Sequence, residues 1–357
     1  MYDVPHLRFP EFSGEWERKR LKDVCNIRTG NKNTQDKSDN GIYPFYVRSQ
    51  IVERINSWTF DGEAILTAGD GVGVGKVFHY STGKIGVHQR VYILSDFKCD
   101  GKYLYSYFAG NFYNRVKRMS AKNSVDSVRM EMIADMPIAL PSIEEQKKIG
   151  HLLALLDDRI ATQNKIIEDL KKLKSVISKS IFSLIEDGKS MLLGDVAHIS
   201  NGCGDVQDAD TIKREGWYPF FDRSEEQKWF PTYSIDKEAI IYAGEGQSFY
   251  PRYYKGKFAL HQRCYAITDF SEILSPKYCY YFMGTLNSYF IRNAVGSTVP
   301  SLRIDMFQKV KLRIPSIKRQ KDIVSMFDML NMKCENETSI MVLFKEQKFH
   351  LLQQMFI

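Results

Sequence analysis

The sequence predicts an α+β protein in which a globular segment followed by a long helix occurs twice. Two stretches, 144–187 and 318–357, have helical hydrophobic periodicity over about forty residues with no internal proline. The motifs of the first globular segment, 1–143, return in the same order in the second, 188–317. This self-similarity indicates an internal duplication. We therefore expect two pseudo-repeated globular domains whose long helices pair as an antiparallel coiled coil.

The first long helix begins with a capping signature, Ser142 followed three residues later by Glu145, and Gly188 stands just past its end. A helix of about forty residues is roughly 60 Å long. Its apolar residues follow one another at steps of three and four, with Gln163 at the one polar step, which is typical of a coiled-coil seam. The predicted seam contains Leu153, Leu156, Ile160, Ile167, Leu170, Leu173, Ile177, Ile181 and Leu184.

The second long helix repeats the beginning of the first at a constant offset. Pro315-Ser316-Ile317 matches Pro141-Ser142-Ile143, and Gln320 matches Gln146. Arg319 takes the place of the capping glutamate, so we expect a weaker cap there. The predicted seam of this helix contains Ile323, Phe327, Leu330, Cys334, Met341, Phe344, Leu351 and Met355.

The globular segments are expected to be mixed, with short strands separated by Gly, Asn and Asp turns and an amphipathic helix beginning near Lys102. Several short motifs occur in both. The repeated pairs are Tyr43-Pro44-Phe45 with Tyr218-Pro219-Phe220, Arg48-Ser49 with Arg223-Ser224, the AGDG turn at 68–71 with the AGEG turn at 243–246, His88-Gln89-Arg90 with His261-Gln262-Arg263, and Lys102-Tyr103 with Lys277-Tyr278. Between these anchors the loops differ, which suits the recognition of two different features.

The chain has 357 residues, a formal net charge of +7 and a hydrophobic content of 43%. Most of the excess positive charge lies on the globular segments, where a polyanion would dock, although a mildly basic surface alone is ordinary. The six cysteines include no CxxC pair, which favours reduced thiols in the cytoplasm and argues against a metal site. We expect neither secretion nor membrane insertion, because the N-terminal stretch has no apolar core and no long apolar run occurs.

The sequence resembles the specificity subunit of type I restriction-modification systems over essentially its whole length. The resemblance rests on LPSIEEQKKI (140–149) and IPSIKRQKDI (314–323) at the heads of the long helices, on LRFPEFSGEW (7–16), and on the AGDG and AGEG turns. It implies two target recognition domains that read the halves of a split, asymmetric DNA sequence. It also implies helices that set the gap and hold two methyltransferase subunits, with translocase/nuclease subunits joining for cleavage.

The resemblance further implies a non-catalytic chain without a cofactor of its own, since S-adenosylmethionine, ATP and magnesium belong to the partner subunits. Two other functions remain open. A self-contained DNA-modifying enzyme is disfavoured because the sequence contains no Pro-Pro pair and hence no Asn-Pro-Pro-aromatic loop. A two-headed adaptor that binds proteins would show binding that depends little on salt, whereas DNA binding falls steeply with salt.

The repeated basic residues are the first candidates for DNA contact. Arginine pairs with phosphate or with guanine, and serine holds the phosphate backbone, although an arginine in an ion pair at a strand end is the ordinary alternative. We expect the histidine and glutamine of each His-Gln-Arg triplet to serve the scaffold or a shared phosphate contact. The shared candidates are Arg48, Ser49, Arg90 and Arg129 in the first domain and Arg223, Ser224, Arg263 and Arg303 in the second.

The divergent loops are better candidates for reading bases, because residues shared by both domains do not explain two different target sequences. Asparagine and glutamine match adenine, and lysine and arginine match guanine or phosphate, although any one of them is more often a solvated loop residue. The glycines of GDGVGVGK (69–76) match neither of two nucleotide-binding motifs, GxxxxGK(S/T) and GxGxxG. We therefore expect them to form tight turns. The loop candidates are Lys76, Lys122, Asn123, Gln247, Arg252, Tyr253 and Lys255.

Apolar residues of the first long helix outside the seam are candidates for binding partner subunits. The alternative is a coiled coil that dimerises, but two matched helices in one chain favour intramolecular pairing through their high effective concentration. The candidates are Ile149, Leu152, Leu155, Ile166 and Val176.

Overall fold

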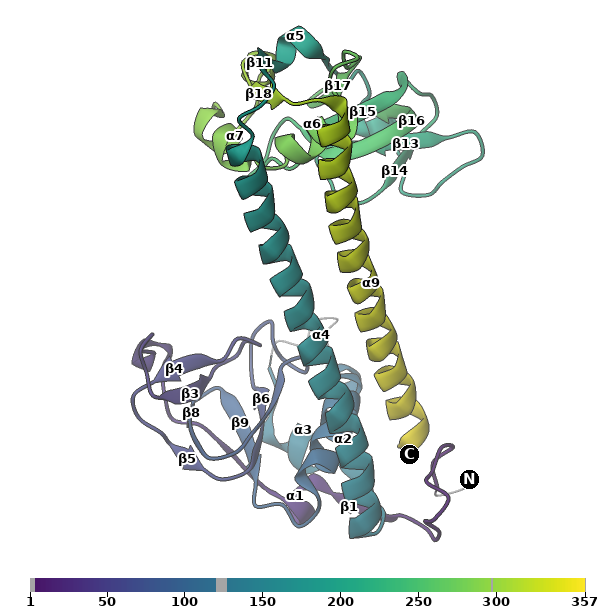
Figure 1. The fold of residues 1–357 in the computed structure, drawn as a ribbon. Helices are drawn as coiled ribbons and strands as arrows, with labels where there is room; N and C mark the ends of the chain where they lie inside the picture. Colours follow the sequence, from purple (N-terminus) through teal and green to yellow (C-terminus); the bar gives the residue numbers. More distant parts are fainter. Residues whose placement is uncertain (1–3, 120–126, 297, 357) are drawn as a thin grey trace. The chain divides into compact units, whose positions relative to one another are not determined.

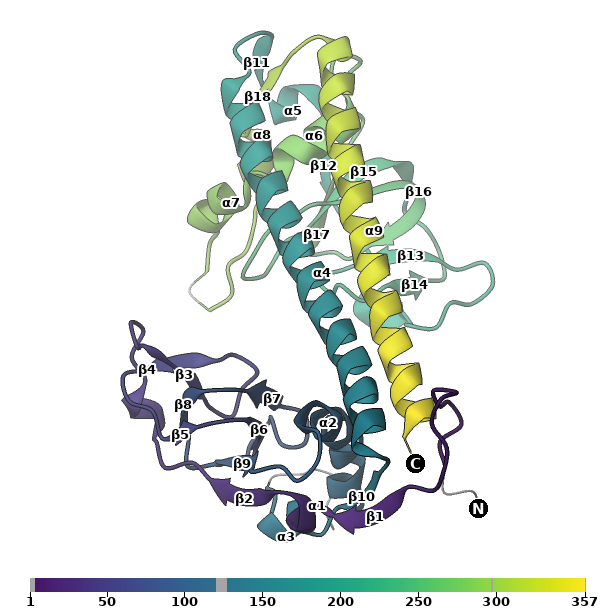
Figure 2. The same ribbon diagram turned by 60° about the horizontal axis from the view of Figure 1, so that its bottom comes forward.

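The computed structural model describes residues 4–119, 127–296 and 298–356, and it confirms the mixed α+β class. The chain divides into two compact units, unit 1 (Met1–Asn164 and Ser339–Ile357) and unit 2 (Lys165–Thr338). Each unit therefore contains half of each long helix, α4 (Ile143–Leu184) and α9 (Ile317–Met355) (Figures 1 and 2). None of the described helices is long and apolar enough to cross a membrane.

Unit 1 contains a two-stranded pair and two four-stranded sheets. The pair is β1 (Glu17–Arg20) with β10 (Pro137–Leu140). One sheet has the order β2 (Asn26–Thr29), β9 (Val91–Ser95), β6 (Ala64–Ala68), β7 (Phe78–Ser81), and the other β4 (Glu53–Ile55), β3 (Tyr43–Tyr46), β8 (Lys84–Val87), β5 (Phe60–Asp61). The helices are α1 (Leu21–Val24), η1 (Thr34–Asp36), α2 (Gly101–Met119) and α3 (Met130–Ala134).

Unit 2 repeats this arrangement with longer strands. Its pair is β11 (Lys189–Leu192) with β18 (Lys311–Ile314), and its six-stranded sheet has the order β12 (His198–Asn201), β17 (Cys264–Thr268), β15 (Ile235–Ala243), β16 (Arg252–Leu260), β13 (Tyr218–Phe221), β14 (Lys228–Phe230). The helices are α5 (Leu193–Val196), η2 (Val206–Asp208), α6 (Pro276–Met283), α7 (Asn287–Asn293) and α8 (Ile304–Gln308). Strands β15 and β16 run without a break where unit 1 has β5 and β6, then β7 and β8.

Equivalent tyrosines fix the helix that follows each sheet. Tyr103 of α2 is buried and donates its hydroxyl hydrogen to the Ala139 carbonyl at 2.6 Å. Tyr278 of α6 donates in the same way to the Arg313 carbonyl at 2.7 Å. Each acceptor lies on the strand just before a long helix. The tyrosine of the repeated Lys-Tyr motif therefore anchors the helix that packs on the sheet, α2 in unit 1 and α6 in unit 2, to that strand.

Each long helix has a stripe of buried and half-buried positions that recur at alternating steps of four and three, which is a period of 3.5 residues. On α4 they are Ile149, Leu153, Leu156, Ile160, Gln163, Ile167, Leu170, Lys174, Ile177 and Ile181; on α9 they are Ile323, Phe327, Leu330, Cys334, Glu337, Met341, Phe344, Lys348, Leu351 and Met355. The predicted seam is wrong at Leu173 and Leu184, which are 48% and 71% exposed. Lys174 takes the place of Leu173 and its Nζ donates to Asn331 at 2.5 Å.

The predicted capping box at Ser142 forms only in part. The Glu145 amide donates to the Ser142 hydroxyl at 3.3 Å, but the buried Glu145 carboxylate accepts two hydrogen bonds from Arg8, both at 2.8 Å. At the head of α9, Arg319 instead pairs with Asp187 at 2.7 Å. Both helix heads therefore hold a charge pair at this position, with the signs reversed.

The glutamines that recur at the two helix heads have the same buried role. Gln146 donates to the Pro141 carbonyl at 2.8 Å and accepts from the Asp100 amide at 3.0 Å. Gln320 donates to the Pro315 carbonyl at 2.8 Å and accepts from the Ser275 amide at 2.8 Å. Each glutamine thus joins the start of a long helix to the loop before the sheet-covering helix.

We expect Gln146→Leu and Gln320→Leu each to destabilise the protein by about 1–3 kcal/mol, because each leaves a buried proline carbonyl and a partly buried backbone amide without a partner. Urea unfolding followed by circular dichroism measures this loss. Gln347→Leu, at an exposed position of α9, is the control and should change stability by less than about 0.5 kcal/mol. Equal stability of all three variants would contradict the anchoring role.

Candidate nucleic-acid interface

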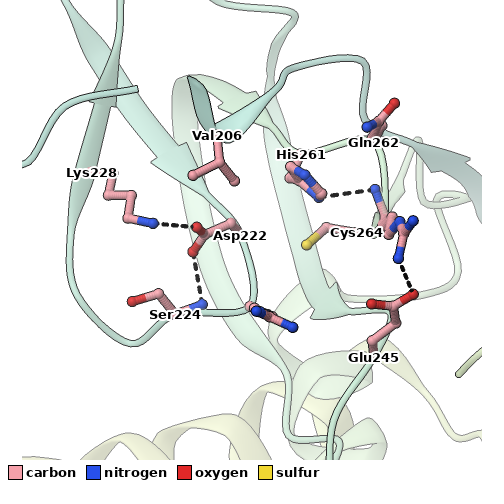
Figure 3. Close-up of a pocket in the computed structure, with 10 residues that line it drawn as sticks. Val206, Asp222, Ser224, Lys228, Glu245, His261, Gln262 and Cys264 are labelled. Atoms are coloured by element: carbon pink, nitrogen blue, oxygen red, sulfur yellow. Dashed lines mark hydrogen bonds and ion pairs between the residues drawn. The ribbon is translucent and has the colours of Figure 1, made fainter. Parts of the chain in front are cut away.

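Two hollows of equivalent construction lie in the two units, and residues of the repeated motifs line both. The first hollow, in unit 1, has a volume of about 510 Å³, and the second, in unit 2, about 520 Å³. The first is lined by Asn33, Thr34, Gln35, Arg48, Asp70, His88, Gln89 and Arg90. The second is lined by Val206, Asp222, Arg223, Ser224, Lys228, Glu245, His261, Gln262, Arg263 and Cys264 (Figure 3).

An arginine paired with a carboxylate stands in each hollow. Asp70 accepts from Arg48 at 2.9 Å and lies 3.6 Å from Arg90. In unit 2 the equivalent Glu245 accepts from Arg263 at 2.8 Å. The acids come from the AGDG and AGEG turns, and each turn is fixed by a backbone bridge, to Ser127 in unit 1 and to Ser301 in unit 2. The guanidinium groups stay largely exposed, so they remain accessible to a ligand.

The histidines of the two triplets position the arginines that follow them. His88 is buried, and its Nδ1 accepts from the Arg90 amide at 3.0 Å; His261 Nδ1 accepts from the Arg263 amide at 3.1 Å. Burial lowers the pKa of His88, and the charge of Arg48 lowers it further. Gln89 donates to Asn33 at 2.6 Å. These contacts fit the scaffold interpretation of both histidines and of Gln89.

The repeated serines shape turns. Ser49 donates its hydroxyl hydrogen to the Ile51 carbonyl at 3.0 Å, and the Ser224 hydroxyl accepts from the Glu226 amide at 3.1 Å. Arg223 lines the second hollow beside Ser224, but the first hollow includes only the arginine of the corresponding pair.

Arg252 corrects a prediction, because its guanidinium is used inside unit 2. It donates to the Ser224 carbonyl at 3.0 Å and to the Asp222 carbonyl, and it lies 5.3 Å from the ring centre of Phe221. Burial lowers the pKa of Arg252. His79 binds the equivalent Ser49 carbonyl at 3.1 Å in unit 1. Arg252 therefore holds the turn before the hollow and is not free to read a base.

Tyr253 and Lys255 also lie apart from the second hollow. Both line a separate groove that α9 borders, with Glu238, whose carboxylate accepts from the Tyr253 hydroxyl. The alternation of side chains along β16 explains this, since Arg252 points to the opposite face.

The remaining predicted DNA contacts are exposed but outside the two hollows. Lys76 lies 5.6 Å from the ring centre of Tyr113, and Gln247 is exposed in the loop after the AGEG turn. Arg129 and Arg303 are exposed at the starts of α3 and α8. Lys122 and Asn123 lie outside the described residues.

Several hollow residues were missed by sequence reasoning. Asp222 is buried, and it accepts from Lys228 Nζ and from the Ser224 amide, both at 2.7 Å. Thr34 and Val206 differ between the repeats, so no motif marked them. The acids Asp70 and Glu245 were visible as a recurring carboxylate in the paired turns, which was the available signal.

The predicted partner-binding residues divide into two groups. Ile149 is only 1% exposed and Leu152 is half-buried, and both pack into the core of unit 1. Ile149 is therefore not available to a partner, because the first turns of α4 complete their own unit. Leu155, Ile166 and Val176 are 48%, 39% and 62% exposed.

Among the residues that the structure describes, no group of three or more His, Cys, Asp or Glu side chains is placed to hold a metal ion.

Comparison with known proteins identifies relatives across most of the chain. A relative from Mycoplasma pneumoniae, a putative type I specificity subunit, is 25% identical and covers 87% of this chain and 88% of its own. The type I restriction enzyme EcoDI specificity subunit of Escherichia coli is 29% identical over 46% of this chain. This chain spans only 37% of that subunit and 43% of the MjaVIII specificity subunit of Methanocaldococcus jannaschii.

A solved structure supports the fold. The type I restriction-modification system S subunit from M. genitalium matches with a TM-score of 0.68 over 99% of both chains at 14% identity. The family described as "Type I restriction modification DNA specificity domain" matches residues 13–172 and 185–341. Because these two ranges cover most of the sequence, the chain belongs to the type I restriction-modification DNA specificity family, as its motifs predicted.

Proposed function

We propose that this chain is the DNA specificity subunit of a type I restriction-modification enzyme and that each unit reads one half of a bipartite, asymmetric DNA target. The observation that supports this most directly is the pair of equivalent hollows. Their arginine–carboxylate pairs, histidines and glutamines recur, whereas other residues of their lining differ, such as Thr34 in the first hollow and Val206 and Lys228 in the second. Two hollows that share one set of residues and differ in the others suit the recognition of two different half-sites.

The chemistry of the hollows fits base edges in the major groove. An arginine forms two hydrogen bonds with guanine, a carboxylate accepts from the cytosine amino group, and amides match adenine. Arg90 with Asp70, and Arg263 with Glu245, provide the first two kinds of group. Asn33 adds an amide to the first hollow, and Gln89 positions it by donating to its side-chain oxygen at 2.6 Å.

We propose that α4 and α9 pair as an antiparallel coiled coil that sets the gap between the half-sites. The 3.5-residue period of burial on both helices supports this. Within unit 2, Lys174 contacts Asn331, and within unit 1, Asp157 contacts Lys348, so positions pair in opposite directions along the chain. We expect a gap near one DNA turn, about 34–36 Å.

In this proposal the chain is non-catalytic and works in the cytoplasm with two methyltransferase subunits and with restriction subunits. S-adenosylmethionine, ATP and magnesium are bound by those partners. The exposed apolar residues Leu155, Ile166 and Val176 support a partner surface on α4, because a partner that covers them would remove apolar area from water.

We expect Arg263→Ala to weaken binding of a duplex containing the target by about 5–150-fold and to leave the salt dependence of binding nearly unchanged, because the lost contact is with a base and not with a phosphate. Fluorescence anisotropy at several salt concentrations measures both effects. Arg214→Ala is a matched control, since Arg214 is 61% exposed and pairs with Asp210 at 2.8 Å, whereas Arg263 is 66% exposed and pairs with Glu245 at the same distance. Binding by the unsubstituted chain that ignores salt would instead favour a protein-binding adaptor.

We expect the double variant Leu155→Ser and Val176→Ser to lose complex formation with a type I methyltransferase subunit from the same genome, because both substitutions remove apolar surface from α4. Co-purification with a tagged methyltransferase subunit measures this. The control replaces Ile42 and Val72 by serine, since both are exposed apolar residues of unit 1 outside the long helices. Unchanged co-purification of the α4 variant would rule out this partner surface.

A further inference from the structure

Thr34 and Val206 occupy the same place in the two hollows. Thr34 begins η1, which reads Thr-Gln-Asp, and Val206 begins η2, which reads Val-Gln-Asp. The backbone before each short helix bridges to the equivalent histidine, Lys32 to His88 and Gly204 to His261. Both residues line their hollow, and Figure 3 shows the Val206 side chain directed into the second one.

These two residues are nearly identical in shape, but they differ in the chemistry they present. Threonine has a hydroxyl group where valine has a methyl group. The arginine, carboxylate and histidine around them are shared by both hollows, so those groups offer no means of distinguishing one half-site from the other. A residue that differs between the hollows at an equivalent position can distinguish the two half-sites.

The first hollow presents a hydrogen-bond donor at this position. Because His88 Nδ1 accepts from the Arg90 amide, the ring proton is on Nε2. Nε2 lies 3.4 Å from the Thr34 hydroxyl oxygen, which therefore accepts. The hydroxyl hydrogen is then left to donate into the hollow. In the major groove, such a donor matches the acceptors of guanine, of thymine O4 or of adenine N7.

The second hollow presents apolar carbon and an imidazole N–H. His261 Nδ1 accepts from the Arg263 amide, so its proton is also on Nε2. Val206 has no oxygen to accept a hydrogen bond from His261 Nε2–H, and none of the described residues accepts one from it. The valine methyl groups match the 5-methyl group of thymine, the apolar feature of the major groove.

We propose that Thr34 and Val206 are equivalent specificity-determining residues, each of which sets the base preferred at one position of its own half-site. This inference rests on the proposed function. It assigns to Thr34 a hydrogen bond to a base acceptor and to Val206 an apolar contact with thymine.

The experiment is selection from a pool of random-sequence DNA duplexes by the full-length chain, followed by sequencing. We expect Thr34→Val to reduce discrimination at one base position about fivefold, the worth of one hydrogen bond. Thr34→Ser, which keeps the hydroxyl group, should retain the preference. Val206→Thr should weaken the preference for thymine at one position in the other half-site, and Val206→Ile should keep it.

Thr82→Val and Val342→Thr are matched controls, because both residues are exposed and line neither hollow. Circular dichroism confirms that each variant is folded. An unchanged selected sequence in Thr34→Val and Val206→Thr, or changes that fall in the same half-site, would overturn the proposal and leave the proposed function standing. A wild-type chain that selects no sequence would overturn both.

Discussion

Each globular unit completes its hydrophobic core with the end of the long helix that begins in the other unit. In unit 1, Met355 and Phe356 at the end of α9 are buried, and the Phe356 ring lies 5.2 Å from that of Tyr103. In unit 2, Ile185 follows α4 into the core, and Phe182 lies 5.5 Å from Tyr278. The tyrosines that anchor the two sheet-covering helices are thus covered by distant sequence. Neither core is closed by its own segment, so the stability of both units depends on both helices.

The two units have contacts at equivalent positions even where different residues make those contacts. The carbonyl of Ser49 is bound by His79, and that of the equivalent Ser224 by Arg252. The buried acid at the head of α4 pairs with an arginine from the N-terminal segment, whereas the head of α9 carries an arginine that pairs with Asp187. In both cases a different chemical group makes the contact at the equivalent position, so the backbone arrangement is retained although the residue has changed.

This explains how much was predictable from the sequence. Motifs that recur in both units, such as His88-Gln89-Arg90, predict the residues that the two hollows share. Hydrophobic periodicity predicts most of the buried stripe of α4 and α9. Hydrophobicity predicts Leu173 for that stripe, but Lys174 occupies the position, since a long aliphatic stem can be buried while its amine reaches Asn331. The role of Arg252 depends on the carbonyl groups of Ser224 and Asp222, which are distant in the sequence, and no repeated motif marks Thr34 because it differs from Val206. A contact between residues distant in the sequence leaves no local pattern, and a difference between equivalent residues leaves no repeated motif, so neither can be predicted from repeats.

The carboxylate beside each arginine favours the recognition of bases over simple attraction to phosphate. Water screens an ion pair whose guanidinium is exposed, and such a surface pair contributes only about 0–1 kcal/mol, so Arg263 gives up little when it leaves Glu245 for a ligand. A guanine edge offers about 1–3 kcal/mol in return, and its cytosine partner gives the freed carboxylate a hydrogen-bond donor. A phosphate offers the carboxylate no donor and repels it. Under the proposed function, the hollows therefore supply selectivity, and exposed arginines outside them, such as Arg129 and Arg303, supply attraction to any DNA.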